Sequence, residues 1–436
     1  MKDPDMTRTR GSCGTLFASG FHSFLFVALV LSACSQGPRG ESEPSQNATD
    51  HSSVNTGSSQ KDSAGIKITE TLAEAASAPL DWEVDPVPSL VIGSEEIEAQ
   101  TLFGIRGLRS LPGGGVMLLD AGSQELRFFD SSGQLTHRVG RSGEGPGEFR
   151  DPYLVQTLRG DSLLLWDGAL KRFQLFTPMG EFVRTISLSA RWPTGRNPPM
   201  GAVGETQLAL RPEFLSQAKR WVLGPRTQRY DFVWLDPESG VEVPVSTFWS
   251  QLSSTIGRSG NIPVSGSIPF TTRPSATVTG STALVNDGIS AEILEHGLDG
   301  TVRRIFRVTD GFRRPVDDQA IEGYLQYYVT RNPHRSRSQA EADFNAVPCP
   351  DSMPAFQSLL VDEVGWTWAE VYHWPRNRQS GRWMVFDPDG RAHGILEVPD
   401  GLQVQRIGSD FLLGVRFDKL GVEHVLRYSL RRTPKG

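Results

Sequence analysis

The sequence predicts an all-β fold built from a repeated unit of short strands. Glycine and proline make up 74 of the 436 residues, about 17% against an average usage of about 12%, so the chain contains many turns. Beyond residue 80, short apolar runs alternate with these turns. The turn glycines Gly133, Gly180, Gly240, Gly300 and Gly390 are separated by 47, 60, 60 and 90 residues. A strand–strand–turn–strand unit that repeats about every 40–60 residues is typical of a β-propeller blade.

Six copies of this unit occur along the chain. They span residues 113–140, 161–186, 230–240, 283–300, 383–390 and 411–430. The sixth copy ends without an outer strand, whereas an additional strand at residues 82–92 precedes the first copy. Because a ring has to hide its sheet edges, we expect this strand to complete the last blade. The prediction is a six-bladed β-propeller closed by an N-terminal strand; an eight-stranded sandwich, the alternative, does not account for the repetition.

A helical insertion is predicted at residues 315–350, between blades four and five. Its apolar residues recur at the spacing of one helix face: Ile321, Tyr324, Leu325, Tyr328 and Val329. Asp317 or Asp318 is expected to cap this helix, and residues 338–341 read as a capping box that opens a second helix. Two positions remain open for the insertion: over the mouth of the central channel, or packed on the side of a blade.

The first residues have the pattern of an export signal. Lys2, Arg8 and Arg10 precede a short apolar run at residues 24–31, as in secretory signal peptides. The run ends in Leu-Ser-Ala-Cys at residues 31–34, which resembles the lipobox of bacterial lipoproteins. The resemblance implies cleavage after residue 33, attachment of acyl chains such as palmitate to Cys34, and sorting to the outer membrane because Ser35 follows. An ordinary signal peptide is the alternative.

The segment after the expected cleavage site is polar and rich in serine. We expect residues 34–79 to form a lipidated flexible tether, with a short helix at residues 68–76, and residues 80–436 to form the propeller. Once Cys13 is removed and Cys34 is lipidated, Cys349 alone remains, so the folded part has no internal disulfide. The net charge of −6 argues against a nucleic-acid partner.

One loop carries a family resemblance. Residues 140–152 read Gly-Arg-Ser-Gly-Glu-Gly-Pro-Gly-Glu-Phe-Arg-Asp-Pro, and Phe129, Asp130 and Gly133 form a preceding Phe-Asp-x-x-Gly turn. Both features resemble the repeats of NHL-type propellers. Residues 82–431 as a whole resemble the bacterial six-bladed β-propeller lipoproteins within that superfamily, although the full motif occurs only at this first inter-blade loop.

Recurrent aspartates are the first candidates for chemistry. Asp120, Asp167, Asp236 and Asp287 each follow a strand that is expected to be an inner one. A ring of carboxylates at a channel mouth could bind Ca²⁺, but aspartates at such positions more often fix a turn by accepting backbone N–H groups. The resemblance also includes enzymes that hold zinc on channel histidines, yet the histidines of this chain share no common position in the repeat.

An aromatic row is the candidate binding surface. Trp366, Trp368, Tyr372 and Trp374 follow one another along a predicted strand. Such a row could stack on sugar rings or clamp a peptide. Large aromatic residues in a blade are also expected in the core between blades.

These observations favour a non-catalytic protein of the bacterial cell envelope. No G-x-S-x-G, P-loop, H-E-x-x-H or C-x-x-C motif occurs. We therefore expect a lipoprotein anchored in the outer membrane through Cys34, with its propeller in the periplasm or on the surface, that binds a protein, peptide or glycan without a cofactor. The alternative is a metal-dependent hydrolase or lyase that uses Ca²⁺ or Zn²⁺ at the channel mouth; a quinone-dependent oxidoreductase has no motif in its favour.

Overall fold

The computed structural model describes residues 57–94, 97, 100–157, 162–188, 198–204, 206–214, 224–259, 262–374 and 381–433. All of them belong to one compact unit, Thr56–Gly436. The expected signal peptide and Cys34 lie outside the described residues. The described chain is mostly strand, so the all-β prediction is confirmed.

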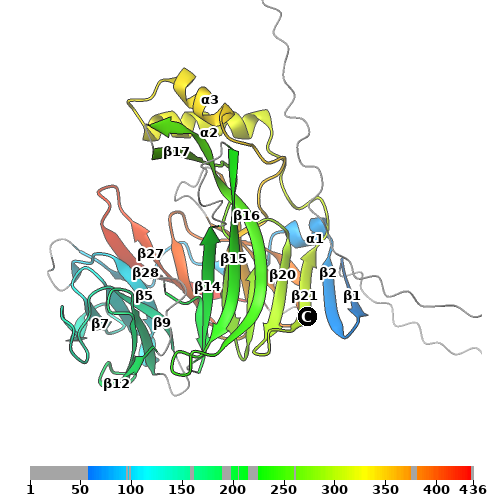
Figure 1. Ribbon diagram of the computed structural model, residues 1–436. Coiled ribbons are helices and arrows are strands. Elements are labelled where there is room, and N and C mark those ends of the chain that lie inside the picture. The colour runs from blue at the N-terminus through cyan, green and yellow to red at the C-terminus, as the bar shows by residue number, and fades with distance from the viewer. Residues whose placement is uncertain are drawn as a thin grey trace, which may run out of the picture. The chain divides into compact units, whose positions relative to one another are not determined.

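The described strands form six separate sheets, numbered here in chain order (Figure 1). Sheet 1 contains β5 (Ile105–Ser110), β6 (Val116–Asp120), β7 (Glu125–Phe129) and β8 (Leu135–Val139). Sheet 2 contains β9 (Pro152–Thr157), β10 (Leu163–Asp167), β11 (Arg172–Phe176) and β12 (Phe182–Ser187). Sheet 3 contains β13 (Gly201–Val203), β14 (Thr206–Phe214), β15 (Gly224–Leu235), β16 (Glu242–Ser259) and β17 (Ile262–Ser267).

In the other three sheets, strands that follow one another in the sequence are again neighbours for the most part. Sheet 4 contains β18 (Ser275–Thr279), β19 (Thr282–Asn286), β20 (Glu292–Gly297) and β21 (Val302–Val308), extended by β2 (Ile66–Thr71) and β1 (Ser58–Ser63). Sheet 5 contains β22 (Phe356–Val361), β23 (Thr367–Val371), β24 (Arg382–Phe386) and β25 (Ala392–Glu397). Sheet 6 contains β26 (Gln403–Ile407), β27 (Phe411–Phe417) and β28 (Glu423–Arg431), with β3 (Glu83–Val84) and β4 (Leu90–Ile92) paired to β28.

Six apolar clusters of the core each lie between two consecutive sheets. Clusters join sheets 1 and 2, 2 and 3, 3 and 4, 4 and 5, and 5 and 6. A further cluster joins sheet 6 to sheet 1, where Leu413 and Val425 pack with Leu118. The second strands are buried on both faces; all five residues of β6 are buried, for example. This explains their continuous apolar sequences and gives the sheets the arrangement of β-propeller blades.

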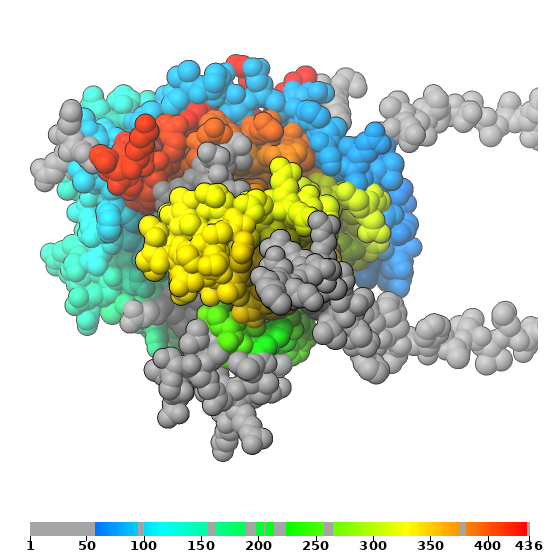
Figure 2. Space-filling view, turned by 90° about the horizontal axis from the view of Figure 1, so that it is seen from above, coloured from blue at the N-terminus to red at the C-terminus, as the bar shows by residue number. Residues whose placement is uncertain are grey.

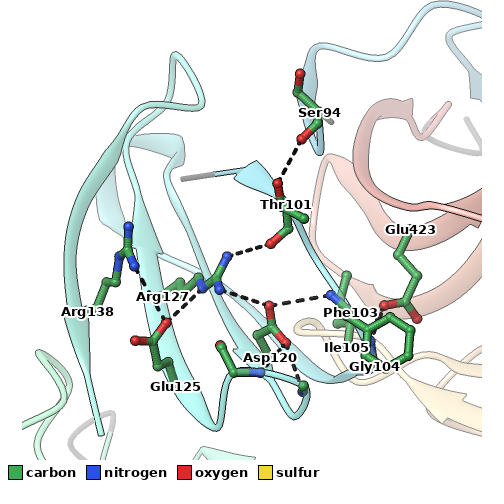
Figure 3. Close-up of polar contacts among 12 residues, drawn as sticks. Ser94, Thr101, Phe103, Gly104, Ile105, Asp120, Glu125, Arg127, Arg138 and Glu423 are labelled. Atoms are coloured by element: carbon green, nitrogen blue, oxygen red, sulfur yellow. Dashed lines mark hydrogen bonds and ion pairs between the residues drawn. The ribbon is translucent and has the colours of Figure 1, made fainter. Parts of the chain in front are cut away.

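Polar contacts (Figure 3) add to the apolar cluster between the last and first sheets. The Glu423 carboxylate, at the start of β28, accepts hydrogen bonds from the backbone N–H groups of Gly104 and Ile105, the latter at 3.0 Å. β4 pairs with β28 in the register Val425↔Ile92. Segments more than 300 residues apart in the sequence are therefore bonded to each other.

The expected tether is shorter than predicted, because the described chain is already folded from β1. β2 pairs in parallel with β21, and the Thr69 hydroxyl donates to the carbonyl of Asp389 at 2.7 Å. The helix expected at residues 68–76 is reduced to α1 (Ala73–Ser77). The sequence Ser-Ser-Gln-Lys-Asp-Ser of β1 has no apolar alternation, so it gave no strand signal.

The helical insertion occurs where the sequence predicts it, between β21 and β22. α2 (Asp318–Arg331) is capped by Asp317, whose side chain accepts from Ala320 N at 2.8 Å. α3 (Arg337–Asn345) begins two residues earlier than expected, because Ser336, not Ser338, forms the capping box with Gln339. No helix within the described ranges is long and apolar enough to cross a bilayer.

Both helices pack on residues at one end of the sheets. Leu325 of α2 and Phe344 of α3 form a cluster with Phe270, Met353 and Tyr372. In Figure 1 the long strands β15 and β16 extend beyond the other strands toward this pair. Figure 2 shows α2 and α3 (yellow) in front of the sheets on this face. The insertion therefore covers one end of the sheets and is not packed on the side of a blade.

Candidate functional site

A cavity of about 460 Å³ lies where the first strands of the six sheets meet. Every sheet contributes to it. The lining residues are Arg106, Gly107, Leu108, Tyr153, Leu154, Val155, Pro198, Pro199, Met200, Gly201, Thr277, Val278, Leu360, Val361, Gln405, Arg406 and Ile407. The volume falls in the range of roughly 300–1,000 Å³ that is usual for small-molecule sites.

Two glycines allow the first strands to approach each other closely. A Cβ at Gly107 would lie 2.3 Å from the Cβ of Leu154, and a Cβ at Gly201 would lie 2.6 Å from the Cγ2 of Val278. Both distances are too short for non-bonded carbon atoms, so glycine is required at these positions. Aliphatic residues are the most numerous in the lining, but polar atoms make up more of its accessible surface than apolar atoms. Irregular pairing of β5, β9 and β26 with their neighbours interrupts the side-chain alternation around the cavity.

Arg406 brings a positive charge to this cavity. Its Nε donates to the Leu108 carbonyl at 3.1 Å, which connects β26 of sheet 6 to β5 of sheet 1. Burial lowers the pKa of Arg406; the Glu363 carboxylate acts against this shift, and Arg109 adds to it. Because the ordinary pKa of arginine is above 12, Arg406 remains a cation.

Arg106 is the second charged residue of the lining. Its guanidinium forms an ion pair with Asp151 and lies 4.3 Å from the centre of the Tyr153 ring. Among the described lining residues these two arginines carry the only charges, and none is a carboxylate. Sequence reasoning missed this pair because the charged residues of the inner strands do not recur from repeat to repeat.

The four candidate aspartates do not form a metal site. Asp120, Asp167 and Asp287 follow the second strands of their sheets, whereas Asp236 follows β15, the third strand of sheet 3. Since adjacent strands are antiparallel, Asp236 lies at the opposite end of its sheet. No group of three or more His, Cys, Asp or Glu side chains within the described part of the chain is arranged to hold a metal ion.

The carboxylates of these aspartates are bonded within the fold. Asp120 accepts from Gly122 N at 2.9 Å and pairs with Arg127 at 3.3 Å (Figure 3). Asp167 accepts from four backbone N–H groups, including that of Arg150 at 2.8 Å. Asp287 likewise accepts from Ser290 N at 2.7 Å. They fix turns, which is the structural role that the sequence suggested for them.

Asp236 has the same turn-forming role at the other end of sheet 3. It accepts from Ser239 N and from Glu238 N, each at 2.9 Å. The Ser239 N–H is the main cause of a pKa lowered below the ordinary aspartate value, and that of Glu238 adds to it.

The aromatic row is divided between two packing clusters. Trp368 is fully buried between sheets 5 and 6, and Trp366 packs against the same cluster. Tyr372, 1% exposed, and Trp374 belong to the cluster beneath α2 and α3. Trp368 and Tyr372 therefore have no face available for stacking on a ligand.

Several histidines are paired within the sheets. His393 lies 2.8 Å from Asp387, and His424 lies 3.5 Å from Asp418 at the equivalent turn of the next sheet. His296 is buried, with Nε2 at 2.8 Å from the Ser246 hydroxyl. None of these histidines lines the central cavity.

Comparison with known proteins finds matches among solved structures at low sequence identity. No protein-family model matches the chain, and no curated protein is similar to it in sequence. A member of the DUF4221 family from Bacteroides vulgatus is 12% identical, over 82% of this chain and 100% of that one, with a TM-score of 0.47. Virginiamycin B lyase from Staphylococcus aureus is 8% identical over 80% and 99% of the two chains, with a TM-score of 0.35. The PQQ-bound aldose sugar dehydrogenase from Streptomyces coelicolor is 12% identical over 81% and 100%, with a TM-score of 0.37.

Proposed function

We propose that this protein is an envelope lipoprotein whose propeller binds a ligand in the central cavity without transforming it. The observation that carries the proposal is a cavity of about 460 Å³ lined by the first strand of every sheet. A space of this size accepts a small molecule, or the end of a peptide or glycan chain, but no folded partner.

A binding role agrees with the chemistry of the lining. The charged lining residues, Arg106 and Arg406, are guanidinium groups that do not exchange protons near neutral pH. The histidines and aspartates that could act as acids, bases or metal ligands are bonded elsewhere in the sheets. The alternative, a metal-dependent hydrolase or lyase, therefore loses the ligands on which it was based.

The proposal treats the six sheets as six blades of a single closed ring. The pairing of β4 with β28 and the Glu423 hydrogen bonds support closure between the last and first blades. The loop at residues 140–152 supports membership of the NHL-like superfamily.

Binding in the cavity can be tested with small aromatic probes. Benzoate, benzamide and benzamidinium share one shape and differ in charge, and ligand-observed NMR measures their affinities. We expect at least one probe to bind and Thr277→Trp, which fills the cavity from β18, to abolish this binding. Thr136→Trp, on the exposed face of β8, is the matched control. Binding that survives Thr277→Trp would place the site elsewhere and refute the proposal.

The membrane anchor is a separate part of the proposal. Lipidation at Cys34 predicts that the full chain fractionates with membranes and that Cys34→Ala shifts it to the soluble fraction. Cys13→Ala, within the expected signal peptide, is the control and should leave fractionation unchanged. If Cys34→Ala remains in the membrane fraction, the lipoprotein assignment is wrong.

A further inference from the structure

Positively charged side chains outnumber carboxylates among the described residues around the cavity. Besides the lining residues Arg106 and Arg406, Arg109 is buried close enough to Arg406 to lower its pKa. The carboxylates described as facing the two lining arginines are Asp151 and Glu363, and neither lines the cavity. The polar groups nearest a bound molecule are therefore cationic or neutral.

Arg406 has hydrogen-bonding capacity to spare. A guanidinium carries five N–H groups in a planar fork, and the bond found for Arg406 among the described residues is the one from Nε to Leu108. The two terminal nitrogens have no protein acceptor in that part of the chain. Their parallel N–H groups match the two oxygens of a carboxylate.

Arg106 is held differently. Its pairing with Asp151 and its position over Tyr153 fix the side chain at the cavity wall. The charge of Arg106 is thereby largely compensated before any ligand enters. Arg406 donates to the neutral Leu108 carbonyl, and in the described part of the chain Glu363 acts on it without forming an ion pair. Arg406 is therefore the stronger attractor for an anion.

The lining residues other than the arginines determine which groups the rest of the ligand can carry. Val155, Val278 and Leu360 add aliphatic side chains to a lining whose accessible surface is more polar than apolar. Each Å² of apolar ligand surface that these side chains bury contributes about 25 cal/mol. A cation entering the same space would lose hydration and meet like charge, so it is rejected.

From this arrangement we propose that the cavity binds a small organic carboxylate, with its carboxylate on the terminal nitrogens of Arg406 and the rest of the molecule between the polar and aliphatic groups of the lining. Gln405, Thr277 and Tyr153, the uncharged polar residues of the described lining, offer further hydrogen bonds. This assignment rests on the proposed function, because it names the ligand class of the same cavity.

A purely structural role for Arg406 makes a different prediction. If the residue served only to connect β26 to β5, replacing it would change stability but not the order of probe affinities. The charge dependence of binding therefore distinguishes recognition from support.

The test compares the three isosteric probes in the full-length protein and its variants. We expect benzoate to bind at least about tenfold more tightly than benzamide, as for a hydrogen bond to a charged group, and benzamidinium to bind least. Arg406→Gln should reduce benzoate affinity to that of benzamide and leave benzamide unchanged. Arg138→Gln, a 41% exposed arginine on β8, is the control and should bind all three probes as the parent does.

The outcomes separate this inference from the proposed function. If benzamide binds as tightly as benzoate and Thr277→Trp blocks both, the cavity is a binding site but the anion assignment is wrong. If no probe binds, both proposals fail. If Arg406→Gln weakens all three probes equally, the residue shapes the cavity and recognises no charge, which overturns the inference. Unchanged urea denaturation of Arg406→Gln would show that the variant is folded.

Discussion

Removing the Arg432 guanidinium should destabilise the contact between sheet 5, sheet 6 and the N-terminal segment. Nη2 of Arg432 lies 2.9 Å from Oδ2 of Asp362, a carboxylate with 0% of its side chain exposed. The same nitrogen donates to the Gly408 carbonyl at 2.6 Å, and the guanidinium lies 4.7 Å from the centre of the Trp82 ring. The residue after β28 thus contacts sheet 5, sheet 6 and the N-terminal segment. Arg432→Met keeps an apolar stem and removes these interactions.

The size of the effect follows from what Asp362 retains. Its carboxylate still accepts from Trp366 N at 2.8 Å and from the Trp368 indole at 2.9 Å, so it is not left without partners. The loss is therefore less than the 3–5 kcal/mol expected when a buried charge loses its only partner. The guanidinium donates charged hydrogen bonds to Asp362 and Gly408 and makes a cation–π contact, while its Nε and Nη1 are buried without a partner in the described part of the chain. Because removing these two unpaired nitrogens offsets part of the loss, we expect a net loss of about 2–4 kcal/mol.

Urea unfolding followed by tryptophan fluorescence measures this difference. The matched control is Arg337→Met, because Arg337 pairs with Glu322 on the surface of the helical insertion and exposed pairs contribute little. The coupling between Arg432→Met and Asp362→Asn should be well above zero in a double-mutant cycle. If Arg432→Met is no more destabilising than Arg337→Met, the reasoning about this contact is refuted.

Three further variants probe other parts of the fold. Gly390→Ala should lower the free energy of unfolding by at least about 2 kcal/mol, since φ is +83° and the new Cβ would lie 2.2 Å from Phe306. Gly421→Ala is the control and should lower it less, because φ is +88° but no atom lies within 4 Å. Equal melting temperatures of the two variants would contradict the packing argument. Asp317→Ala should reduce stability by about 1 kcal/mol through loss of the α2 cap, with Asp317→Asn as the conservative control; a chemical-denaturation midpoint equal to that of the parent would contradict this. Burial lowers the pKa of His296 below its usual 6.5, so the folded state favours the neutral ring. The contribution of His296 to the free energy of unfolding is therefore fully present above about pH 6.5 and is lost as the pH falls toward the pKa of the folded state. His296→Asn should therefore show a smaller drop in urea midpoint between about pH 7.5 and pH 5.5, and an identical drop in both proteins would show that another group is responsible.

The sequence revealed those elements that carry local signals. Turn glycines and continuous apolar strands marked the sheets, and the spacing of Tyr324, Leu325 and Tyr328 marked α2. The β1–β2 hairpin was missed because its polar residues become a strand through pairing with β21, a partner more than 200 residues away. The β-strand propensity of a segment contains no information about so distant a partner.

The candidate site was harder to predict. Asp236 and Asp120 both follow a predicted strand in the sequence. Asp120 ends a second strand, whereas Asp236 follows a third strand, which runs in the opposite direction, and only the order of strands in the sheets shows this difference. The cavity residues come one to three at a time from six inner strands, and Arg406 belongs to one of the shortest of them. A site assembled in this way has no spacing for a motif to match.

The β1–β2 hairpin also affects how the folded unit responds to tension from the chain that precedes it. Ser58 pairs with Thr71 at the open end of the hairpin, so a pull on residue 57 opens β1 one pair at a time and does not shear all pairs at once. Release of residues 58–71 adds 14 residues of chain, roughly 45 Å when extended. Sheet 4 would then retain β18–β21, the same number of strands as its neighbour sheet 5. Under tension the hairpin can therefore unfold and lengthen the preceding chain while the four strands β18–β21 remain paired.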